Sequence, residues 1–326
     1  MPPFEPLPLL RNPHIQTVLG HLWNRARPGL PAVTSFVSLP DGDALAVHET
    51  RPVGWAPGGP QAVLVHGLGG CHQSGYMIRV TNRLAERGWR VVRVDMRGAG
   101  AGAGRASRLY NAAGSGDIRC VVDHVRAEAP DSPTALVGFS LGGNVVLKLA
   151  GETGGRGLRA IVAVAPPVDL ERCSGLIERQ PLYNGFFVRH LVAQVRAQEQ
   201  ARRLPAFPFP RRLSLFLFDD LYTAPRGGFA GATDYYRKAS SAPLLSGIET
   251  PTLILAARDD PFVCGRTLAR LPPHSFMETH MEAHGGHLGF LGRDGAGGVR
   301  WAERYIVEWL MRGISRGRLF SGPCVG

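Results

Sequence analysis

The stretch that decides the fold runs from Thr134 to Gly151 and reads TALVGFSLGGNVVLKLAG. Its first six residues are typical of a short buried strand, and the residues from Leu141 onward predict a helix. Between them stands Ser140, flanked by Gly138 and Gly142 in the pattern G-x-S-x-G. Such a sharp strand-to-helix turn strains the serine backbone, and side chains at the two glycine positions would clash. The pattern therefore predicts a serine that projects above the C-terminal edge of a sheet.

This context makes Ser140 a candidate nucleophile. A helix N-terminus offers partial positive charge and free N–H groups, which stabilise a developing oxyanion. The glycine-rich loop His66–Gly70 (HGLGG) follows an earlier apolar run, so that a second backbone N–H can point to the same place. We expect the N–H groups of Leu68 and Leu141 to form an oxyanion hole; a plain turn is the alternative reading of the loop.

An activated serine needs a base, and the base needs a carboxylate that orients it. The predicted strand in LILAARDDPF ends with two acids, Asp259 and Asp260. In a common pattern the acid stands three positions after a small residue, and Ala257 then points to Asp260. Asp259 is the alternative, because a shift of one residue at a strand end turns the side chain the other way.

Three histidines fall within eight residues near the end of the chain: His280, His284 and His287. His287 follows Gly285-Gly286, which free the backbone to swing an imidazole over the sheet edge, so we predict His287 as the general base. His280 closes a predicted strand and should pack against the sheet or a helix, while His284 begins the loop. The spacing H-x₃-H-x₂-H matches no common metal signature, and we predict no metal site.

Around these motifs the chain alternates between strands and helices. Strands are predicted at residues 32–40, 44–50, 61–66, 90–95, 134–139, 158–167, 252–260 and 274–280. Helices are predicted at residues 75–87, 117–128, 141–151 and 299–312, and Asp41-Gly42-Asp43 is a hairpin signal between the first two strands. This alternation predicts an α/β fold with a mostly parallel central sheet flanked by helices.

The stretch 170–236 breaks this rhythm and is too long for an ordinary connection. We predict that it is a helical cap inserted between two parts of the core, residues 1–169 (with an N-terminal extension at 1–31) and residues 237–326. Its aromatic residues fit either a pocket for an acyl or lipid tail or the cap's own core; they are Phe186, Phe187, Phe207, Phe209, Phe216 and Phe218.

Composition limits the partners. Lys and Arg exceed Asp and Glu by 37 − 26 = 11 in 326 residues, but the basic residues are spread along the whole chain. We therefore expect no nucleic-acid partner and at most a peripheral membrane contact. The segment Gly98–Ala103 formally fits a dinucleotide fingerprint, yet no helix is predicted to follow it at once, and we predict no cofactor.

The compartment is predicted from the cysteines and from the start of the chain. The five cysteines are scattered and odd in number, which favours a reducing compartment over a disulfide framework. The opening residues MPPFEPLPLLRNPH lack a basic region followed by an apolar run, so no signal peptide is predicted. We expect a cytoplasmic protein; the oligomeric state is left open.

With these motifs, the chain resembles the α/β-hydrolase superfamily and, within it, the YheT-like group, the AB hydrolase 4 family. Similar segments run almost end to end and include RNPHIQTVLG, VLVHGLGG, GFSLGGNVVLKLAGE, PTLILAARDDPF and HGGHLGFLG. The most family-specific piece is Asn12-Pro13-His14 with Gln16-Thr17, whose role the sequence leaves open.

The resemblance implies a nucleophile at Ser140, a base at His287 and an acid at Asp259 or Asp260. It also implies esterase- or lipase-like hydrolysis of carboxylic esters, with a small-molecule or lipid ester as substrate and no cofactor. Two alternatives stay open: a thioesterase or amidase with the same three residues, and a non-catalytic protein that binds an acyl lipid.

Overall fold

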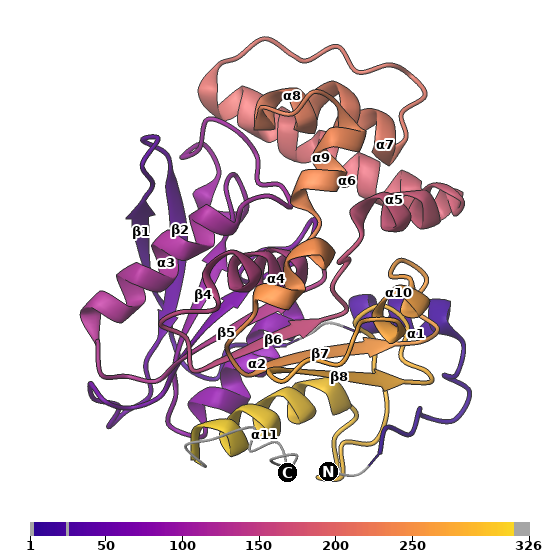
Figure 1. Cartoon of the computed structure of the whole chain (residues 1–326). Coiled ribbons are helices and arrows are strands. Elements are labelled where there is room, and N and C mark those ends of the chain that lie inside the picture. The colour runs from indigo at the N-terminus through magenta and orange to yellow at the C-terminus, as the bar shows by residue number, and fades with distance from the viewer. Residues whose placement is uncertain (1–2, 24–25, 316–326) are drawn as a thin grey trace.

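One sheet runs through the molecule (Figure 1). In this computed structural model, which describes residues 3–23 and 26–315, eight strands follow the order β1-β2-β4-β3-β5-β6-β7-β8. They are β1 (Val33–Ser38), β2 (Ala44–Thr50), β3 (Gln61–Val65), β4 (Arg90–Asp95), β5 (Thr134–Phe139), β6 (Ala160–Val164), β7 (Thr252–Ala257) and β8 (Met277–Glu282). Strand β2 pairs antiparallel with β1 and β4, and the pairs from β4 to β8 are parallel. The predicted mostly parallel sheet is confirmed.

Helices cover both faces of the sheet. Two separate apolar clusters, one on each face, fill the space between the sheet and its helices. One cluster includes side chains of α3 (Ser115–Glu128) and α4 (Leu141–Thr153), and the other includes side chains of α2 (Gly75–Ala85) and α11 (Trp301–Ser315). The shorter elements of the core are η1 (Gly100–Gly102), η3 (Ala242–Gly247) and α10 (Gly265–Ala269), and a further helix, α1 (Pro13–Leu22), lies near the N-terminus.

The segment between β6 and β7 folds into a group of helices above one end of the sheet (Figure 1). Its elements are α5 (Leu170–Glu178), α6 (Pro181–Arg202), α7 (Leu215–Phe218), the π-helical turn η2 (Asp219–Thr223), α8 (Ala224–Gly227) and α9 (Ala232–Ala239). Aromatic and aliphatic side chains of this group form a third apolar cluster, which also contains Phe262 of the core. None of the described helices is both long and apolar enough to cross a membrane.

Several element boundaries differ from the sequence prediction by a few residues, and two of these differences have a clear local reason. The strand predicted at 274–280 begins at Met277, because the N–H of Phe276 donates to the ring of His274 and forms a tight turn. The predicted strand 158–167 ends at Val164, because Ala165 has a φ of 47° and two prolines follow. The described cysteines are free thiols, and Cys324 lies outside the described residues.

The strand order brings distant loops to one edge. Strand β5 lies between β3 and β6, and β7 and β8 follow on the same side. Because these strands are parallel, the loops after their carboxyl ends meet at that edge, where open α/β sheets bind their ligands. These are the loops that follow β3, β5, β7 and β8, and they carry the candidate residues of the sequence analysis.

Candidate functional site

Ser140 lies in the strained turn between β5 and α4. Its backbone adopts φ 50° and ψ −121°, a conformation that side-chain-bearing residues rarely adopt. A Cβ atom on Gly138 would lie 2.3 Å from the carbonyl oxygen of Gly142, and one on Gly142 would lie 2.4 Å from that of His66. The turn is therefore possible only with glycine on both sides of the serine.

The structure brings Ser140, His287 and Asp260 into one chain of hydrogen bonds. His287 Nε2 lies 2.8 Å from Ser140 Oγ, and His287 Nδ1 lies 2.8 Å from Asp260 Oδ2. The other carboxylate oxygen, Asp260 Oδ1, accepts from the backbone N–H groups of Phe262 (2.8 Å) and Val263 (3.0 Å). The fully buried carboxylate is thus held in place from its far side and presents one oxygen to the imidazole.

Asp259 and the other two histidines lie elsewhere. Asp259 Oδ1 accepts from the N–H of Gly286 at 3.0 Å, and its Oδ2 is 3.4 Å from His284 Nδ1. His280 contacts Glu282 (2.8 Å) and the hydroxyl of Tyr305 on α11 (3.1 Å). Asp259 therefore supports the backbone of the loop after β8 that carries His284 and His287, which we call the histidine loop. Asp260 contacts His287, the histidine that faces Ser140.

The loop between β3 and α2 is fixed on both sides of Leu68. The N–H of Gly67 donates to the hydroxyl of Tyr76 at 3.0 Å, and that of Gly69 donates to the hydroxyl of Tyr110 at 2.6 Å. Leu68 itself lines a pocket together with Leu141, Ser140 and His287. The two residues whose N–H groups were predicted to form an oxyanion hole thus lie on the same pocket as the serine.

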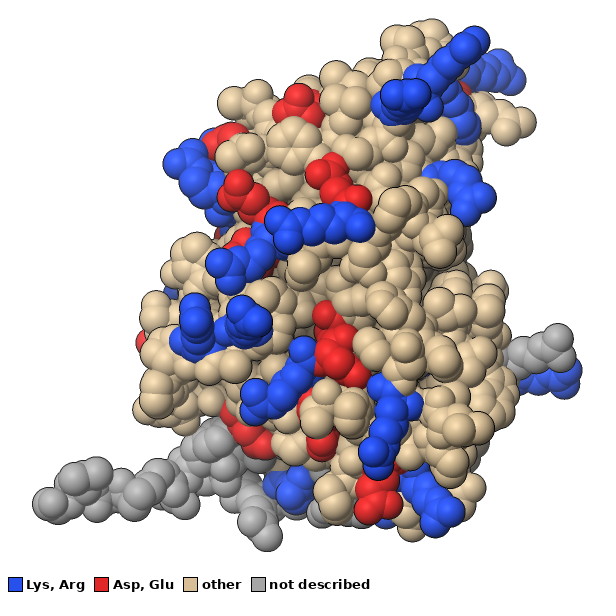
Figure 2. All heavy atoms as spheres, turned by 90° about the vertical axis from the view of Figure 1, so that its right-hand side faces the viewer, with Lys and Arg blue, Asp and Glu red and all other residues tan. Residues whose placement is uncertain are grey.

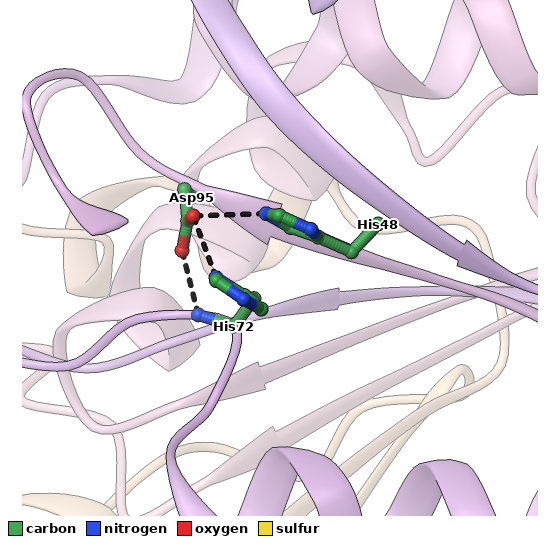
Figure 3. Close-up of side chains that lie close together, drawn as sticks. All are labelled: His48, His72 and Asp95. Carbon is green, nitrogen blue, oxygen red and sulfur yellow. Dashed lines mark hydrogen bonds and ion pairs between the residues drawn. The ribbon is translucent and has the colours of Figure 1, made fainter. Parts of the chain in front are cut away.

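A polar cluster anchors the far end of this loop (Figure 3). Asp95 Oδ2 accepts from His48 Nε2 (3.0 Å), His72 Nδ1 (2.7 Å) and the N–H of Ala101 (2.9 Å), and Asp95 Oδ1 accepts from the N–H of His72 (2.6 Å). Burial raises the pKa of Asp95, but the hydrogen bonds from His48 and His72 outweigh it and leave the pKa below its ordinary value.

The same three side chains are the group within the described residues whose ligand atoms lie close enough together for a metal ion. Their geometry argues against one. The two imidazole rings are stacked 3.5 Å apart and only 14° from parallel, so their in-plane lone pairs do not converge on one point. Both carboxylate oxygens already accept N–H donors. We therefore assign the cluster to the support of the loop.

Helix α1, which was not predicted from the sequence, packs against the histidine loop and forms hydrogen bonds with its backbone. Asn12 caps the helix by accepting from the N–H groups of His14 and Ile15. Thr17 Oγ1 accepts from the N–H of His287 at 2.9 Å, and the fully buried Gln16 exchanges hydrogen bonds with both backbone groups of Leu291. The segment Asn12–Thr17 thereby acquires a structural role: it positions the loop that carries His287.

The pocket beside Ser140 has apolar walls from both the core and the helices above it. Its free space is about 730 Å³ with the open mouth included. The core and the helices contribute the lining residues Leu68, Leu141, Ile177, Phe187, Leu191, Leu215, Phe262 and Val263. Phe262 also contacts the ring of His287, with centroids 4.7 Å apart. Such a pocket accepts an apolar group next to the serine.

One acid, Asp219, lies in this wall and was not singled out in the sequence. It begins the π-helical turn η2, a geometry that is often found at functional sites. Its carboxylate accepts from the hydroxyl of Tyr236 at 2.7 Å, and that hydroxyl also lies 3.0 Å from Ser174 Oγ. Burial raises the pKa of Asp219 to about 6. No sequence motif marks Asp219, because its neighbours Tyr236 and Ser174 are distant in the chain.

Replacing Asp219 with asparagine is expected to make the protein relatively more stable as the pH rises. The pKa of the carboxyl is about 6 in the folded chain, against an ordinary value of 3.8, so its contribution to stability is complete below pH 4 and is lost as the pH rises through 6. The free energy of unfolding of Asp219→Asn minus that of the wild type should increase by up to about 3 kcal/mol from pH 4 to pH 7.5. Urea unfolding of both proteins at several pH values measures this difference in free energy. A difference independent of pH would refute the raised pKa of Asp219.

The family of the chain follows from comparison with known proteins. The family model described as "Hydrolase_4: Serine aminopeptidase, S33" matches residues 59–271, more than half of the chain. The chain belongs to the Hydrolase_4 family of α/β-hydrolases. YheT of Escherichia coli (strain K12), named as a candidate esterase, is 33% identical over 320 residues, which cover 94% of this chain and 92% of that protein. The resemblance to the YheT-like group is confirmed.

A further relative and a solved structure are also similar to this chain. The monoacylglycerol lipase of Saccharomyces cerevisiae is 26% identical over 265 residues, which cover 77% of this Hydrolase_4 chain but 59% of the lipase. Among solved structures, the 2,6-dihydroxy-pseudo-oxynicotine hydrolase matches with a TM-score of 0.62 at 18% identity, over 94% of this chain and 73% of that one. At this identity the structural match shows the shared fold.

Proposed function

We propose that the chain hydrolyses carboxylic esters through an acyl-enzyme formed on Ser140. The observation that carries the proposal is the continuous pair of 2.8 Å contacts from Ser140 Oγ through His287 to Asp260. A serine held this way beside an apolar pocket has a base within reach of its proton and a carboxylate that fixes the base. The names of the relatives, a candidate esterase and a lipase, support the same chemistry.

The reaction follows from this geometry. His287 Nε2 takes the hydroxyl proton of Ser140 as the oxygen attacks the acyl carbonyl, and Asp260 stabilises the imidazolium that forms. The histidine then gives the proton to the leaving alcohol, which breaks the ester bond and leaves the acyl group on Ser140. A water molecule, activated by the same imidazole, attacks this acyl-enzyme and releases the acid.

The oxyanion of each tetrahedral intermediate is assigned to the N–H groups of Leu68 and Leu141. Leu141 is the first residue of α4, so its N–H has no partner within the helix. The hydroxyls of Tyr76 and Tyr110 occupy the N–H groups on either side of Leu68 and fix the loop without involving Leu68 itself. A preorganised pair of donors of this kind needs no rearrangement when the charge develops.

The apolar lining favours an acyl chain, and the helices of residues 170–236 act in this proposal as a cap over it. One observation favours a second activity. An aminopeptidase must bind a free amino group, and Asp219 places a carboxylate in the pocket wall. The family model is itself described as a serine aminopeptidase. We favour the ester because Asp219 already accepts from Tyr236 within a mostly apolar wall.

A series of three butyryl substrates and one aminoacyl substrate separates these possibilities. Purified protein is tested with p-nitrophenyl butyrate, a butyryl thioester, butyryl p-nitroanilide and alanine p-nitroanilide, the last with a free amine. We expect kcat/KM for the ester to exceed that for either anilide by about 10³ or more, because an amide is the harder bond to break. Preferred turnover of alanine p-nitroanilide would make the protein an aminopeptidase, and preferred turnover of the thioester a thioesterase. Turnover of none of the four would favour a non-catalytic acyl-binding protein.

Replacing Thr17 with valine tests the support from α1. Valine keeps the shape but removes the oxygen that accepts from the N–H of His287. A buried donor without a partner costs about 1–3 kcal/mol, and the displaced imidazole is expected to lower kcat for p-nitrophenyl butyrate about tenfold. Val18→Thr, on the exposed side of the same helix, is the control and should keep wild-type kcat. Unchanged kcat in Thr17→Val would show that α1 does not position the base.

A further inference from the structure

Helix α1 is turned the opposite way to an ordinary surface helix. A helix at a protein surface normally buries its apolar stripe and exposes its polar side. In α1 the polar Gln16 and Thr17 are buried against the histidine loop, while Ile15, Val18 and Leu22 face outward at positions i, i+3 and i+7. The polar side of the helix is used for holding the loop, which leaves an apolar stripe at the surface.

The beginning of α6 continues this stripe. The ring of His14 stacks on Tyr183, with a hydrogen bond of 3.1 Å between them, and His21 contacts Phe186 edge to face. Two segments far apart in the sequence therefore lie side by side. Their outward apolar side chains are between 41% and 89% exposed, and we call them the α1/α6 face: Ile15, Val18, Leu22, Trp23, Leu182 and Phe186.

The charged side chains that α6 and the residue before α1 place beside this face are arginines. Helix α1 contains no acid, and the single acid of α6, Glu199, lies near the other end of that helix and is paired with Arg196. The exposed Arg189 follows Leu182 and Phe186 on the same side of α6, and the exposed Arg11 precedes α1. Figure 2 faces the side of the molecule on which α1 lies. The middle of its right half is a broad surface without charged side chains, with Lys and Arg side chains above and below it, and the Asp and Glu side chains lie mainly toward the left and centre.

The face also adjoins the pocket. The ring of Tyr183 contacts Phe262 at 4.6 Å between centroids, and Phe262 contacts the ring of His287 at 4.7 Å. On its inner side, α1 holds His287 through Thr17. An apolar surface that docks against α1 and α6 would therefore lie close to the pocket wall formed by Phe262 beside His287.

We propose that the α1/α6 face docks on the surface of an anionic phospholipid bilayer. Apolar side chains that include an indole, bordered by arginines and free of acids, match the interfacial region of such a membrane, and the net charge of +11 attracts the whole chain to it. The contact is peripheral. It rests on the proposed function only in its purpose, which is to deliver an ester from the lipid layer to the pocket.

Vesicle co-sedimentation tests the proposal. The full chain is mixed with vesicles of phosphatidylcholine alone or with one third phosphatidylglycerol, and the test variant is the double substitution Val18→Glu with Leu182→Glu. We expect the wild type to sediment with the anionic vesicles, and the double variant to bind at least about tenfold more weakly. Val53→Glu, at a fully exposed valine away from this face, should bind like the wild type.

Three results would overturn it: no binding of the wild type to either vesicle, equal binding by the double variant, or a wild-type dimer that the double variant splits without any vesicle binding. The last would assign the face to a second copy of the chain. Turnover of p-nitrophenyl butyrate in solution should be the same in wild type and double variant, which shows that the variant is folded. Ser140→Ala should still bind vesicles, so failure of the hydrolase proposal and failure of the docking proposal are distinguishable.

Discussion

Ser140→Ala is expected to lower kcat/KM for p-nitrophenyl butyrate by a factor of about 10⁵–10⁶, the loss typical of a serine nucleophile. The hydroxyl oxygen of Ser140 is the atom that attacks the acyl carbonyl. His287 only takes its proton, and the oxyanion donors only stabilise the intermediate that the attack forms. The residual rate should come from the oxyanion donors and the pocket alone. Steady-state kinetics on freshly purified protein measure this loss.

Folding of this variant is not expected to limit the result, because alanine removes one oxygen from a side chain whose hydrogen-bond partner is His287. Its free energy of unfolding should equal that of the wild type or exceed it, since the strained turn keeps its two glycines. A variant that retains more than one tenth of the wild-type rate while remaining folded would show that Ser140 is not the nucleophile.

Asp260→Asn is expected to lower kcat about 10⁴-fold, because it would hold His287 in the wrong tautomer. Asp260 Oδ1 accepts from the N–H groups of Phe262 and Val263, so the carbonyl of an asparagine would take that place. Its NH₂ group would then face His287 Nδ1 and donate to it. The imidazole would have to carry its proton on Nε2, where it could no longer accept the proton of Ser140.

Asp259→Asn is the matched control for that experiment. The neighbouring acid supports the N–H of Gly286, and an asparagine oxygen can accept the same bond, so kcat should stay within about threefold of the wild type. Comparing the two variants shows which of the two carboxylates orients His287. If Asp259→Asn lost the activity and Asp260→Asn kept it, the orientation of the histidine would come from the other carboxylate.

The parts of the site that could be predicted from the sequence depend on local backbone chemistry. The turn around Ser140 requires glycine at two fixed positions, and this constraint is visible in five consecutive residues. Paired glycines before His287 likewise mark a loop that can bend sharply. The strands are short apolar runs between turn signals, so their positions followed within a few residues and the sheet with them.

Other features depend on contacts between distant segments and left no such signal. Helix α1 buries Gln16 and Thr17 rather than apolar residues, so its periodicity gives no helix pattern of the usual kind. The loop residues that Thr17 and Gln16 hold, His287 and Leu291, are more than 260 residues away in the chain. The position of Asp219 in the pocket wall similarly depends on how α7 and α9 pack. Which of Asp259 and Asp260 contacts His287 depends on the direction in which each side chain points after the end of β7, and the sequence does not determine that direction.

Covalent labelling by a fluorophosphonate tests the central claim most directly, because the reagent reacts with a serine only when a neighbouring base activates it. Mass spectrometry of the intact protein, followed by peptide mapping, should show one adduct on the peptide that contains Ser140. The adduct should be absent in Ser140→Ala and in His287→Ala, and present in His280→Ala and His284→Ala. An unlabelled wild type, or an adduct that survives His287→Ala, would contradict the assignment of Ser140 and His287.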